Sequence, residues 1–286
     1  MTQTYQDPKL RQRGRASVDF LAQMAMASGG VRQGVDAAIA ERVPDPEALP
    51  EDLDERLEYM DIRLDDVPAY TVQKLMGDWH GRMHGRIAAE AFEEVKDDLA
   101  EVFEASENGP ATLELNPDLT PPSYWDGVNF HRTHGGWDKH PEQGYVHGEI
   151  VHKKMVARFF PGGIFKQRAD VAKLAPRENY ERILDMGCSS GHFTTGLQMS
   201  YTDAQITGVA LAAPMIKHAW RTANANGWNW KLYQRAAEDT GFAEGSFDLV
   251  ASYIVLHEMP EEAIRKLFAE AFRVLEPGGD MLMSDV

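Results

Sequence analysis

Ile183-Leu184-Asp185-Met186-Gly187-Cys188-Ser189-Ser190-Gly191-His192-Phe193 is the stretch that decides the fold. An apolar run, predicted to be a strand, leads into an acid and then into a glycine-rich turn, and a helical pattern begins at His192. This order places backbone N–H groups and a carboxylate at the carboxyl end of a parallel strand, where nucleotide-like ligands bind. We therefore expect a ligand site at this turn.

A regular alternation of strands and helices surrounds this turn from Tyr180 onward. The predicted strands are Arg182–Met186, Gln205–Ala210, Trp230–Arg235, Phe247–Tyr253 and Met281–Asp285. The predicted helices are His192–Ser200, Pro214–Asn226 and Glu261–Leu275, with a sharp turn at Glu276-Pro277-Gly278-Gly279. Such alternation predicts an α/β fold with a doubly wound, mainly parallel sheet and right-handed crossovers. The sheet is expected to end after its fifth strand.

The preceding chain has a different character, and we expect three parts: residues 1–109, 110–165 and 166–286. The first is helical, with segments between Arg15 and Arg42 broken at Ser28-Gly29-Gly30, a proline linker at Pro44, Pro46 and Pro50, and a short helix over Asp52–Leu64. Apolar residues at spacings of three or four then predict one long helix from Val72 to Val102. Its glycines, Gly77, Gly81 and Gly85, either split the helix or form a groove for another helix.

The middle part, residues 110–165, is rich in proline, glycine, histidine and aromatic residues. A long irregular segment of this kind is usually functional or mobile, and we expect it to lie over the mouth of the C-terminal domain. Its aromatic side chains either line an acceptor pocket or brace the segment: Trp125, Phe130, Trp137 and Tyr145.

Composition excludes several classes of function. The net charge of −16 and the scattered basic residues argue against a nucleic-acid substrate. No apolar run approaches the roughly 20 residues that span a bilayer, so membrane insertion is not expected. Cys188 is the single cysteine of the 286 residues and excludes an intramolecular disulfide, which favours a cytoplasmic location.

Three further motifs restrict the ligand of the glycine-rich turn, which alone fits either a nicotinamide-cofactor fold or a methyltransferase fold. They are Ala237-Glu238-Asp239 before Gly245-Ser246-Phe247-Asp248, Leu256-His257-Glu258-Met259-Pro260, and Arg273-Val274-Leu275-Glu276-Pro277-Gly278-Gly279. Over about residues 180–286 this succession resembles the class I S-adenosylmethionine (SAM)-dependent methyltransferases, particularly the ubiquinone/menaquinone-biosynthesis-like small-molecule branch. The resemblance implies a Rossmann-like fold with SAM as cofactor.

The resemblance also implies roles for individual residues. Asp185 would hold the methionine amino group of SAM, and Gly187 and Gly191 would let the backbone approach the ligand closely. Ala237 and Glu238 match the adenine-contacting stretch, where an acidic side chain accepts a hydrogen bond from the exocyclic amine. The implied SAM site is completed by Cys188, Ser189, Ala210, Leu211 and Tyr253.

Ala210 is where the sequence departs from the family. The second strand usually ends in an acid that binds both ribose hydroxyls, and alanine has no side-chain acceptor. Each charge-assisted hydrogen bond lost in this way costs about 1.5–3 kcal/mol. The ribose is held from elsewhere, or the position was altered deliberately, or catalysis was lost.

Histidines supply the candidate bases for methyl transfer. His257, at the carboxyl end of the fourth strand, is the first candidate, and His131 and His134 are the second. Each can instead be structural: His257 by bonding Glu258 or backbone, the others by packing on aromatic rings. His80 and His84 stand four apart on a helix but lack a clear third ligand, so no metal site is expected.

The sequence therefore predicts a SAM-dependent methyltransferase of a small organic molecule, acting at O, C or N and forming a homodimer through its helical part. The alternative is a catalytically impaired or non-catalytic SAM-fold homologue that partners another enzyme; a nicotinamide dehydrogenase ranks third. The family normally adds two strands after the fifth, which would otherwise leave an exposed edge. Either the polypeptide is longer or another chain covers this edge, and we expect the former.

Overall fold

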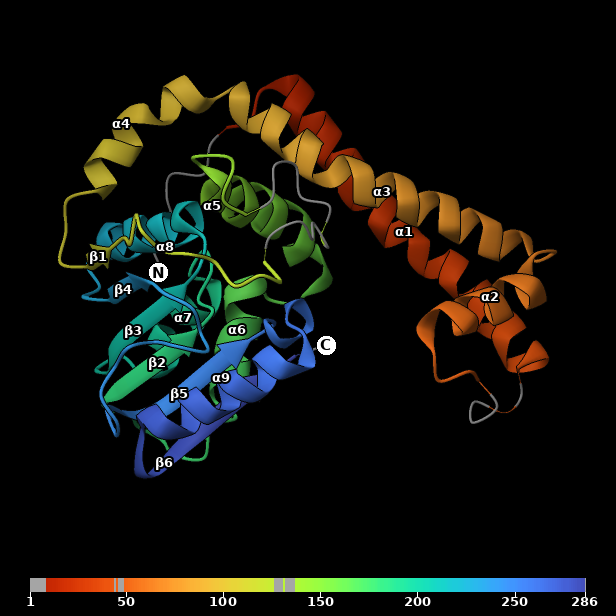
Figure 1. The fold of residues 1–286 in the computed structure, drawn as a ribbon. Coiled ribbons are helices and arrows are strands. Elements are labelled where there is room, and N and C mark those ends of the chain that lie inside the picture. The colour runs from red at the N-terminus through yellow and green to blue at the C-terminus, as the bar shows by residue number, and fades with distance from the viewer. Residues whose placement is uncertain (1–8, 44, 46–48, 126–130, 132–136, 286) are drawn as a thin grey trace.

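A six-stranded parallel sheet forms the centre of the C-terminal half (Figure 1). The computed structural model describes residues 9–43, 45, 49–125, 131 and 137–285. The strand order is β1-β4-β3-β2-β5-β6, and every pair of neighbours is parallel. The strands are β1 (Thr112–Glu114), β2 (Arg182–Met186), β3 (Gln205–Ala210), β4 (Lys231–Gln234), β5 (Phe247–Tyr253) and β6 (Leu275–Ser284). The predicted doubly wound α/β fold is confirmed.

Successive residues of the central strands face opposite sides of this sheet, because side chains alternate along a strand. Ile183 packs into a core with α6 (Ile164–Ala172), α7 (His192–Ser200) and α8 (Ala213–Asn226). The next residue, Leu184, packs into a second core with α9 (Glu261–Val274). Both side chains are fully buried, so the apolar run of β2 serves two layers at once.

Two details of the sheet differ from the prediction. β1 was not expected: it lies within the segment predicted to be irregular and adds to the sheet through β4, with Thr112 opposite Lys231. The second difference is at Glu276–Gly279, predicted as a turn before the last strand. These residues belong to β6, whose register with β5 shifts between Phe247 and Leu249, and Gly278 takes a positive φ of 82° within this irregularity.

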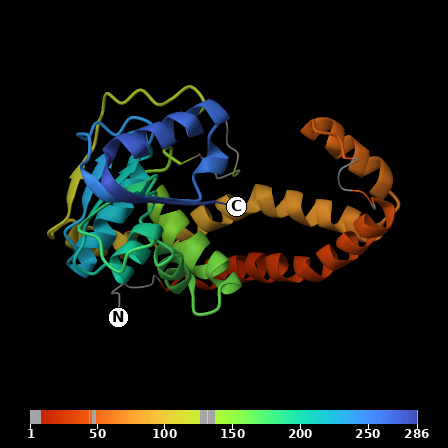
Figure 2. The same cartoon turned by 90° about the horizontal axis from the view of Figure 1, so that it is seen from below.

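The N-terminal helices form a long arm that leaves the sheet domain and returns to it (Figures 1 and 2). α1 (Gln12–Arg42) and α3 (Pro68–Glu93) run side by side, and α2 (Leu53–Leu64) caps the far end. Asp52 starts α2 by accepting hydrogen bonds from the backbone of Asp54 and Glu55, as expected for an N-cap. The predicted helix over Asp52–Leu64 is therefore confirmed.

Two predictions for the arm are wrong, and of the two alternatives for the glycines of α3 the split is ruled out. α1 is continuous through Ser28-Gly29-Gly30, because packing along α3 supplies the stability that the glycines lack. α3 is likewise unbroken at Gly77, Gly81 and Gly85. The single helix predicted from Val72 to Val102 is instead two helices, with a break at Glu94-Val95 before α4 (Lys96–Ser106).

Small residues do mediate a helix contact, but it lies within the chain. At Gly14 of α1 an added Cβ would lie 3.0 Å from the Cβ of Ala91 in α3, and at Gly34 it would lie 3.1 Å from that of Ala69. These close approaches hold the two helices together. Of the predicted linker prolines, Pro44 and Pro46 lie outside the described residues, whereas Pro50 lies between α1 and α2.

The segment over 110–165 is more ordered than predicted. Residues 143–159 form a continuous helical stretch: α5 (Gln143–Tyr145), a π-helix η2 (Val146–Met155) and a 3-10 helix η3 (Val156–Phe159). Tyr145 and Ile150 are fully buried in a core shared with α1, α3 and α4, which is why glycine and histidine here do not make a loop. No described helix is long and apolar enough to cross a membrane.

Candidate functional site

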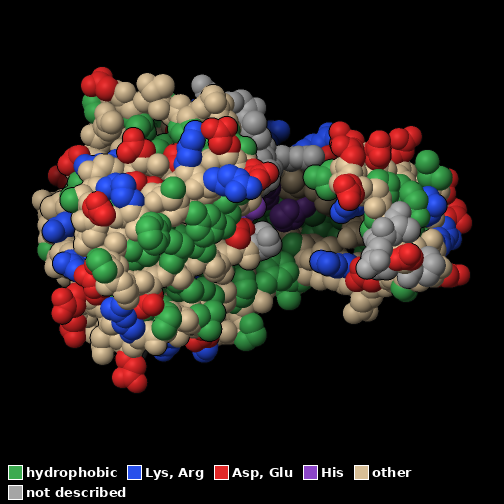
Figure 3. Space-filling model, turned by 60° about the horizontal axis from the view of Figure 1, so that its bottom comes forward, with side chains coloured by type: hydrophobic (Ala, Val, Ile, Leu, Met, Phe, Trp, Pro, Cys, Tyr) green, Lys and Arg blue, Asp and Glu red, His purple; other side chains and the backbone are tan. Residues whose placement is uncertain are grey.

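One cavity of about 470 Å³ lies between the carboxyl ends of the strands, the arm and the π-helix. Its size suits a small-molecule site. Parallel α/β sheets place ligands at this edge, outside the ends of the strands. Figure 3 shows histidine side chains gathered in the hollow between the sheet domain and the arm.

The glycine-rich turn after β2 forms one wall. Gly187 and Gly191 both have φ of 82°, a conformation that favours glycine, and Ser189 adopts φ 51° despite its side chain. The turn is hydrogen-bonded to β3, since the backbone N–H groups of Gly187 and Cys188 both donate to the Val209 carbonyl at 2.9 Å. The turn is thereby fixed against the end of β3.

Most residues expected to bind the cofactor line this cavity. They are Gly187, Cys188, Ser189, Ala210, Leu211, Ala237, Glu238 and Tyr253. Asp185 and Gly191 do not: Gly191 packs on Ala219, where an added Cβ would lie 2.9 Å from the alanine Cβ. The turn thus needs its second glycine for packing against α8 rather than for room beside a ligand.

Asp185 lies beneath the turn and is only 1% exposed. Its carboxylate accepts a hydrogen bond of 2.6 Å from the hydroxyl of Thr194 in α7. Burial raises the pKa of Asp185 to about 7, with the Thr194 hydrogen bond opposing the shift. The pKa of this carboxyl therefore lies near neutral pH. A cationic partner such as an ammonium group would favour the charged form of the carboxyl.

Three buried polar atoms of cavity residues have no hydrogen-bond partner among the described residues: Nε2 of His192 and two atoms of charged side chains. One of the latter two is Oε2 of Glu238, whose Oε1 accepts a hydrogen bond of 2.6 Å from the Tyr124 hydroxyl. The other is Nε of Arg168, a 5%-exposed guanidinium that donates to the Tyr253 hydroxyl at 2.8 Å. Buried polar groups are normally hydrogen-bonded. The Glu238 oxygen therefore suits a hydrogen-bond donor of a ligand, and the Arg168 N–H suits an acceptor.

These two atoms test whether SAM fits. The cofactor carries an adenine amine, which can donate to the Glu238 carboxylate, and a methionine carboxylate, which can accept from the Arg168 guanidinium. Between them the cavity wall is apolar at Ala210, Leu211 and Ala237. The residues present therefore fit SAM, except that no side-chain acceptor stands at Ala210.

The opposite wall is made of histidine and aromatic side chains from the N-terminal half. Its members are His80, His84, Trp125, His131, Trp137, His147, His152, Phe159 and Phe160, together with His192 of α7. Burial lowers the pKa of His147, His152 and His192 well below the usual value, so these rings are neutral. Nδ1 of His152 lies 2.9 Å from Nδ1 of His192, which joins the π-helix to the glycine-rich turn.

The aromatic residues predicted for this segment separate in the structure. Trp125 and Trp137 line the cavity, whereas Tyr145 is fully buried in the helical core. Phe130 and the candidate base His134 lie outside the described residues.

His257 lies at the end of β5, where the chain reverses sharply. Ile254 has φ 55°, a strained value for a β-branched residue, and its N–H donates to the Ser284 carbonyl at 2.8 Å. Nδ1 of His257 lies 2.6 Å from Oδ1 of Asp285, at the end of β6. Since a carboxylate oxygen can only accept, Nδ1 is assigned the proton, and in the neutral ring Nε2 presents a lone pair.

Asp285 also fixes the backbone around this histidine. Its Oδ2 accepts hydrogen bonds from the N–H groups of Val255, Leu256 and His257 at 3.0, 2.6 and 3.3 Å. His257 does not line the cavity itself, but His131 and Glu258 beside it do. The predicted candidates His257 and His131 are thus brought together, with their Nε2 atoms 3.4 Å apart.

Arg168, Tyr124, His152, His192 and Asp285 were not identified from the sequence as site residues. Asp285 could have been predicted as a site residue, since it ends a predicted strand of the parallel sheet, at the edge where ligands bind. Arg168 carried none, because nothing in its helix distinguishes it from a surface arginine.

Comparison with known proteins agrees with this geometry. Residues 183–279 match the family described as "Methyltransferase domain". This part of the chain is similar to class I SAM-dependent methyltransferase domains. S-adenosyl-L-methionine is the cofactor of this family, and the family is one of enzymes.

Several curated methyltransferases are similar to the chain. It is 31% identical over 150 residues to a malonyl-[acyl-carrier protein] O-methyltransferase of Legionella pneumophila, covering 52% of this chain and 47% of the relative. It is 28% identical over 122 residues to a demethylmenaquinone methyltransferase of Thermus thermophilus, covering 43% and 54%. The chain therefore spans about half the length of the curated relatives it matches.

A solved methyltransferase structure is similar to part of the chain at lower sequence identity. A phosphoethanolamine N-methyltransferase 2 of Haemonchus contortus in complex with SAM is 22% identical, with a TM-score of 0.43 over 57% of this chain and 35% of that one. The family match lies at residues 183–279, within the sheet domain.

Proposed function

We propose that the chain binds SAM in the cavity and transfers its methyl group to a small organic acceptor held against the histidine and aromatic wall. The observation that carries this proposal is the single cavity, which joins the family's glycine-rich turn to that wall. Both reactants can then lie in one enclosed space, which supports in-line transfer by positioning.

The residues have distinct proposed roles. Glu238 accepts from the adenine amine, Arg168 holds the methionine carboxylate, and Asp185 attracts the methionine ammonium from beneath the turn. SAM supplies an activated methyl group on its sulfonium. Ala210 at the end of β3 and Ala237 in the loop after β4 are apolar and exclude water around the ligand.

His257 is the proposed base for an acceptor hydroxyl, with His131 beside it. His134, the other candidate base, lies outside the described residues. The Asp285 hydrogen bond keeps the proton on Nδ1 of His257 and leaves Nε2 able to accept one. General base catalysis of this kind contributes about 10²–10⁴-fold to a rate. Asp285 is accordingly a positioning residue.

The acceptor class follows from the wall that would hold it. Neutral imidazoles and indole rings favour a planar or apolar molecule with hydroxyl or carbonyl groups over a strongly cationic one. Relatives named for malonyl-[acyl-carrier protein] and trans-aconitate methylation support an oxygen acceptor, and those named for menaquinone synthesis support a quinol.

A homodimer built on the arm is also proposed. Exposed apolar side chains cluster at its far end, including Leu53, Leu57 and Ile62 of α2 and Leu75 of α3, which are 57–74% exposed. Such patches usually mark an interface. Sedimentation of the wild type and of Leu57→Asp should give a dimer and a monomer, respectively. The lone buried Cys188 supports the cytoplasm as its location.

Calorimetric titration with SAM and with NAD⁺ tests the central proposal. We expect SAM to bind at micromolar to sub-millimolar concentration and NAD⁺ not to bind. Absence of SAM binding at millimolar concentration would overturn the enzyme proposal and favour the alternative that Ala210 suggests, a non-catalytic homologue that partners an active enzyme. Binding of NAD⁺ instead would favour a dehydrogenase.

A further inference from the structure

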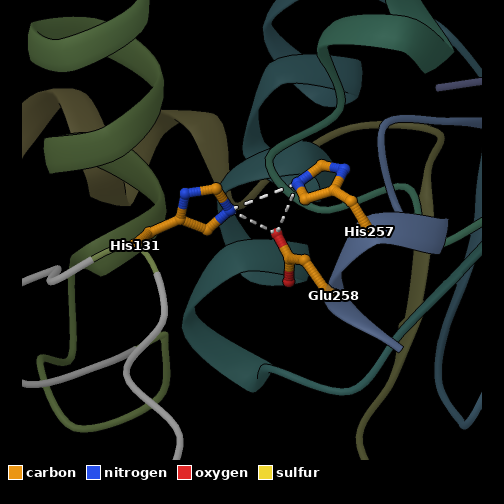
Figure 4. A group of neighbouring side chains, drawn as sticks. All are labelled: His131, His257 and Glu258. Atoms are coloured by element: carbon orange, nitrogen blue, oxygen red, sulfur yellow. Dashed lines mark hydrogen bonds and ion pairs between the residues drawn. The ribbon is translucent and has the colours of Figure 1, made fainter. Parts of the chain in front are cut away.

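Three side chains meet beside the cavity with their donor atoms converging (Figure 4). Nε2 of His131 lies 2.9 Å from Oε1 of Glu258 and 3.4 Å from Nε2 of His257, and the third distance, from His257 to Glu258, is 3.9 Å. In a tetrahedral zinc site with bonds of about 2.0–2.1 Å, neighbouring ligand atoms lie about 3.3 Å apart. The triangle therefore has the dimensions of three corners of such a site.

The proton count within the triangle favours a cation. His257 presents a lone pair from Nε2, because Asp285 holds its proton on Nδ1. The Glu258 carboxylate presents lone pairs as well. Between these two acceptors and His131, at most one proton can lie, on Nε2 of His131. A divalent metal ion at the centre would instead satisfy all three atoms at once.

The surroundings of His257 also resemble those of a metal ligand. Histidines that bind metals usually donate their other ring N–H to a carboxylate, which fixes the ring and raises its basicity. Asp285 takes this position at 2.6 Å and is itself held by three backbone N–H groups. The ring is thus oriented before any ion binds.

We propose that His131, His257 and Glu258 bind a zinc ion with a fourth coordination position open to the cavity. His131 and Glu258 line the cavity, so the open position faces the space proposed for the acceptor. Two histidines and a glutamate with one open position form a recognised catalytic zinc set. Sequence analysis could not find this set, because its members come from segments 126 residues apart.

The ligand of the open position is an oxygen of the acceptor, a step that rests on the proposed function, whereas zinc binding does not. A hydroxyl bound to zinc has a lowered pKa and releases its proton to water at neutral pH. The zinc would then replace His257 as the means of activating the acceptor, since Nε2 cannot be ligand and base at once. Acceptors without an oxygen near the reacting atom are disfavoured.

The histidine pair His80 and His84 is the competing site. Their rings stack at 5.6 Å between centroids, and Nδ1 of His84 lies 3.1 Å from the His80 carbonyl oxygen. Among the described residues, the group of His131, His257 and Glu258 is the one that places three ligand atoms within 4.8 Å of one another. His80→Ala therefore serves as the matched control that removes a histidine of the same cavity.

The test is zinc titration of the full 286-residue chain after dialysis against a chelator, with Co²⁺ absorption as a second readout. We expect one equivalent of zinc at micromolar affinity or tighter, and a Co²⁺ spectrum typical of tetrahedral coordination. Glu258→Gln and His131→Ala should each weaken binding at least tenfold, and Asp285→Asn should weaken it about 10–100-fold. His80→Ala should leave the affinity unchanged.

The proposal is overturned if zinc does not bind at micromolar concentration, or if its affinity survives both Glu258→Gln and His131→Ala. It is also overturned if His80→Ala removes binding, since the ion would then lie at the other pair. Circular dichroism of each variant checks that the fold is intact. Titration of SAM into the same samples separates the two proposals, because SAM binding without zinc binding refutes the metal site alone.

Discussion

Replacing Glu238 by glutamine is the sharpest test of how this cavity recognises the nucleoside half of SAM. One carboxylate oxygen accepts from the Tyr124 hydroxyl at 2.6 Å, and the other is buried without a partner among the described residues. Glutamine keeps the shape and one acceptor oxygen. It also places an NH2 group where one of two acceptors stood, and it removes the negative charge.

The expected loss follows from the kind of hydrogen bond removed. A bond to a charged group contributes about 1.5–3 kcal/mol, which corresponds to a dissociation constant for SAM that is about 10- to 150-fold higher. The amide can rotate to offer its oxygen to the ligand, but it then turns its NH2 toward the Tyr124 hydroxyl. We therefore expect the dissociation constant for SAM to rise at least about tenfold.

Isothermal titration calorimetry of the wild type and Glu238→Gln measures this change. Glu244→Gln is the matched control, since this acid lies in the same loop, is exposed and does not line the cavity; its SAM affinity should change less than twofold. A SAM analogue with oxygen in place of the adenine amine should bind the wild type weakly and show little further loss in Glu238→Gln.

An unchanged SAM affinity in Glu238→Gln would refute the assignment of this carboxylate to the adenine amine. An equal loss for SAM and its oxygen analogue would refute it as well, because the effect would then not depend on the amine. In either case the unpartnered oxygen would serve the acceptor or the ribose instead.

Four further substitutions test other parts of the structure. Ala210→Asp restores an acceptor for the ribose hydroxyls and should tighten SAM binding about tenfold or more by calorimetry; an unchanged affinity would mean that the ribose is held elsewhere. The pKa of Asp185 rises from 3.8 to about 7 on folding, so ionisation of this carboxyl lowers the free energy of unfolding of the wild type as the pH rises from 4 to 7. Urea unfolding should therefore show the stability of Asp185→Asn rising relative to the wild type between pH 5 and pH 8. A constant difference in stability over this range would contradict the assigned pKa. Gly196→Ala should destabilise the protein by about 1–3 kcal/mol or more, because the added Cβ would lie 2.6 Å from the carbonyl carbon of Arg168. Gly29→Ala, with nothing within 4 Å, should instead stabilise it by about 0.5–1 kcal/mol, and equal thermal shifts for the two would contradict the packing described.

The parts of the fold that were predictable are those where local pattern and tertiary environment agree. The β2 run from Arg182 to Met186, the turn to Gly191 and α7 follow from strand, glycine and helix signals that the sheet reinforces. The same agreement holds for Asp52, whose side chain caps the backbone of Asp54 and Glu55 at the start of α2.

Predictions failed where long-range packing outweighs local preference. Glycines in α1 and α3 predicted breaks, but each helix is held along its length by the other. The histidine- and glycine-rich segment predicted as irregular became helical because Tyr145 and Ile150 enter the core formed with the arm. Local propensity contributes about 1 kcal/mol for each glycine, which such burial exceeds.

By itself the sequence determined the class of the domain and the glycine-rich turn at the carboxyl end of β2, since both depend on residues adjacent in the chain. Only the tertiary structure decided that Glu238 and Arg168, each with an unpartnered buried polar atom, line one cavity, and that Asp285 orients His257 beside His131 and Glu258. These relations join residues up to 154 positions apart, from His131 to Asp285. The physical reason is that strand order and helix packing bring distant positions together, whereas periodicity reports only which face of an element is buried.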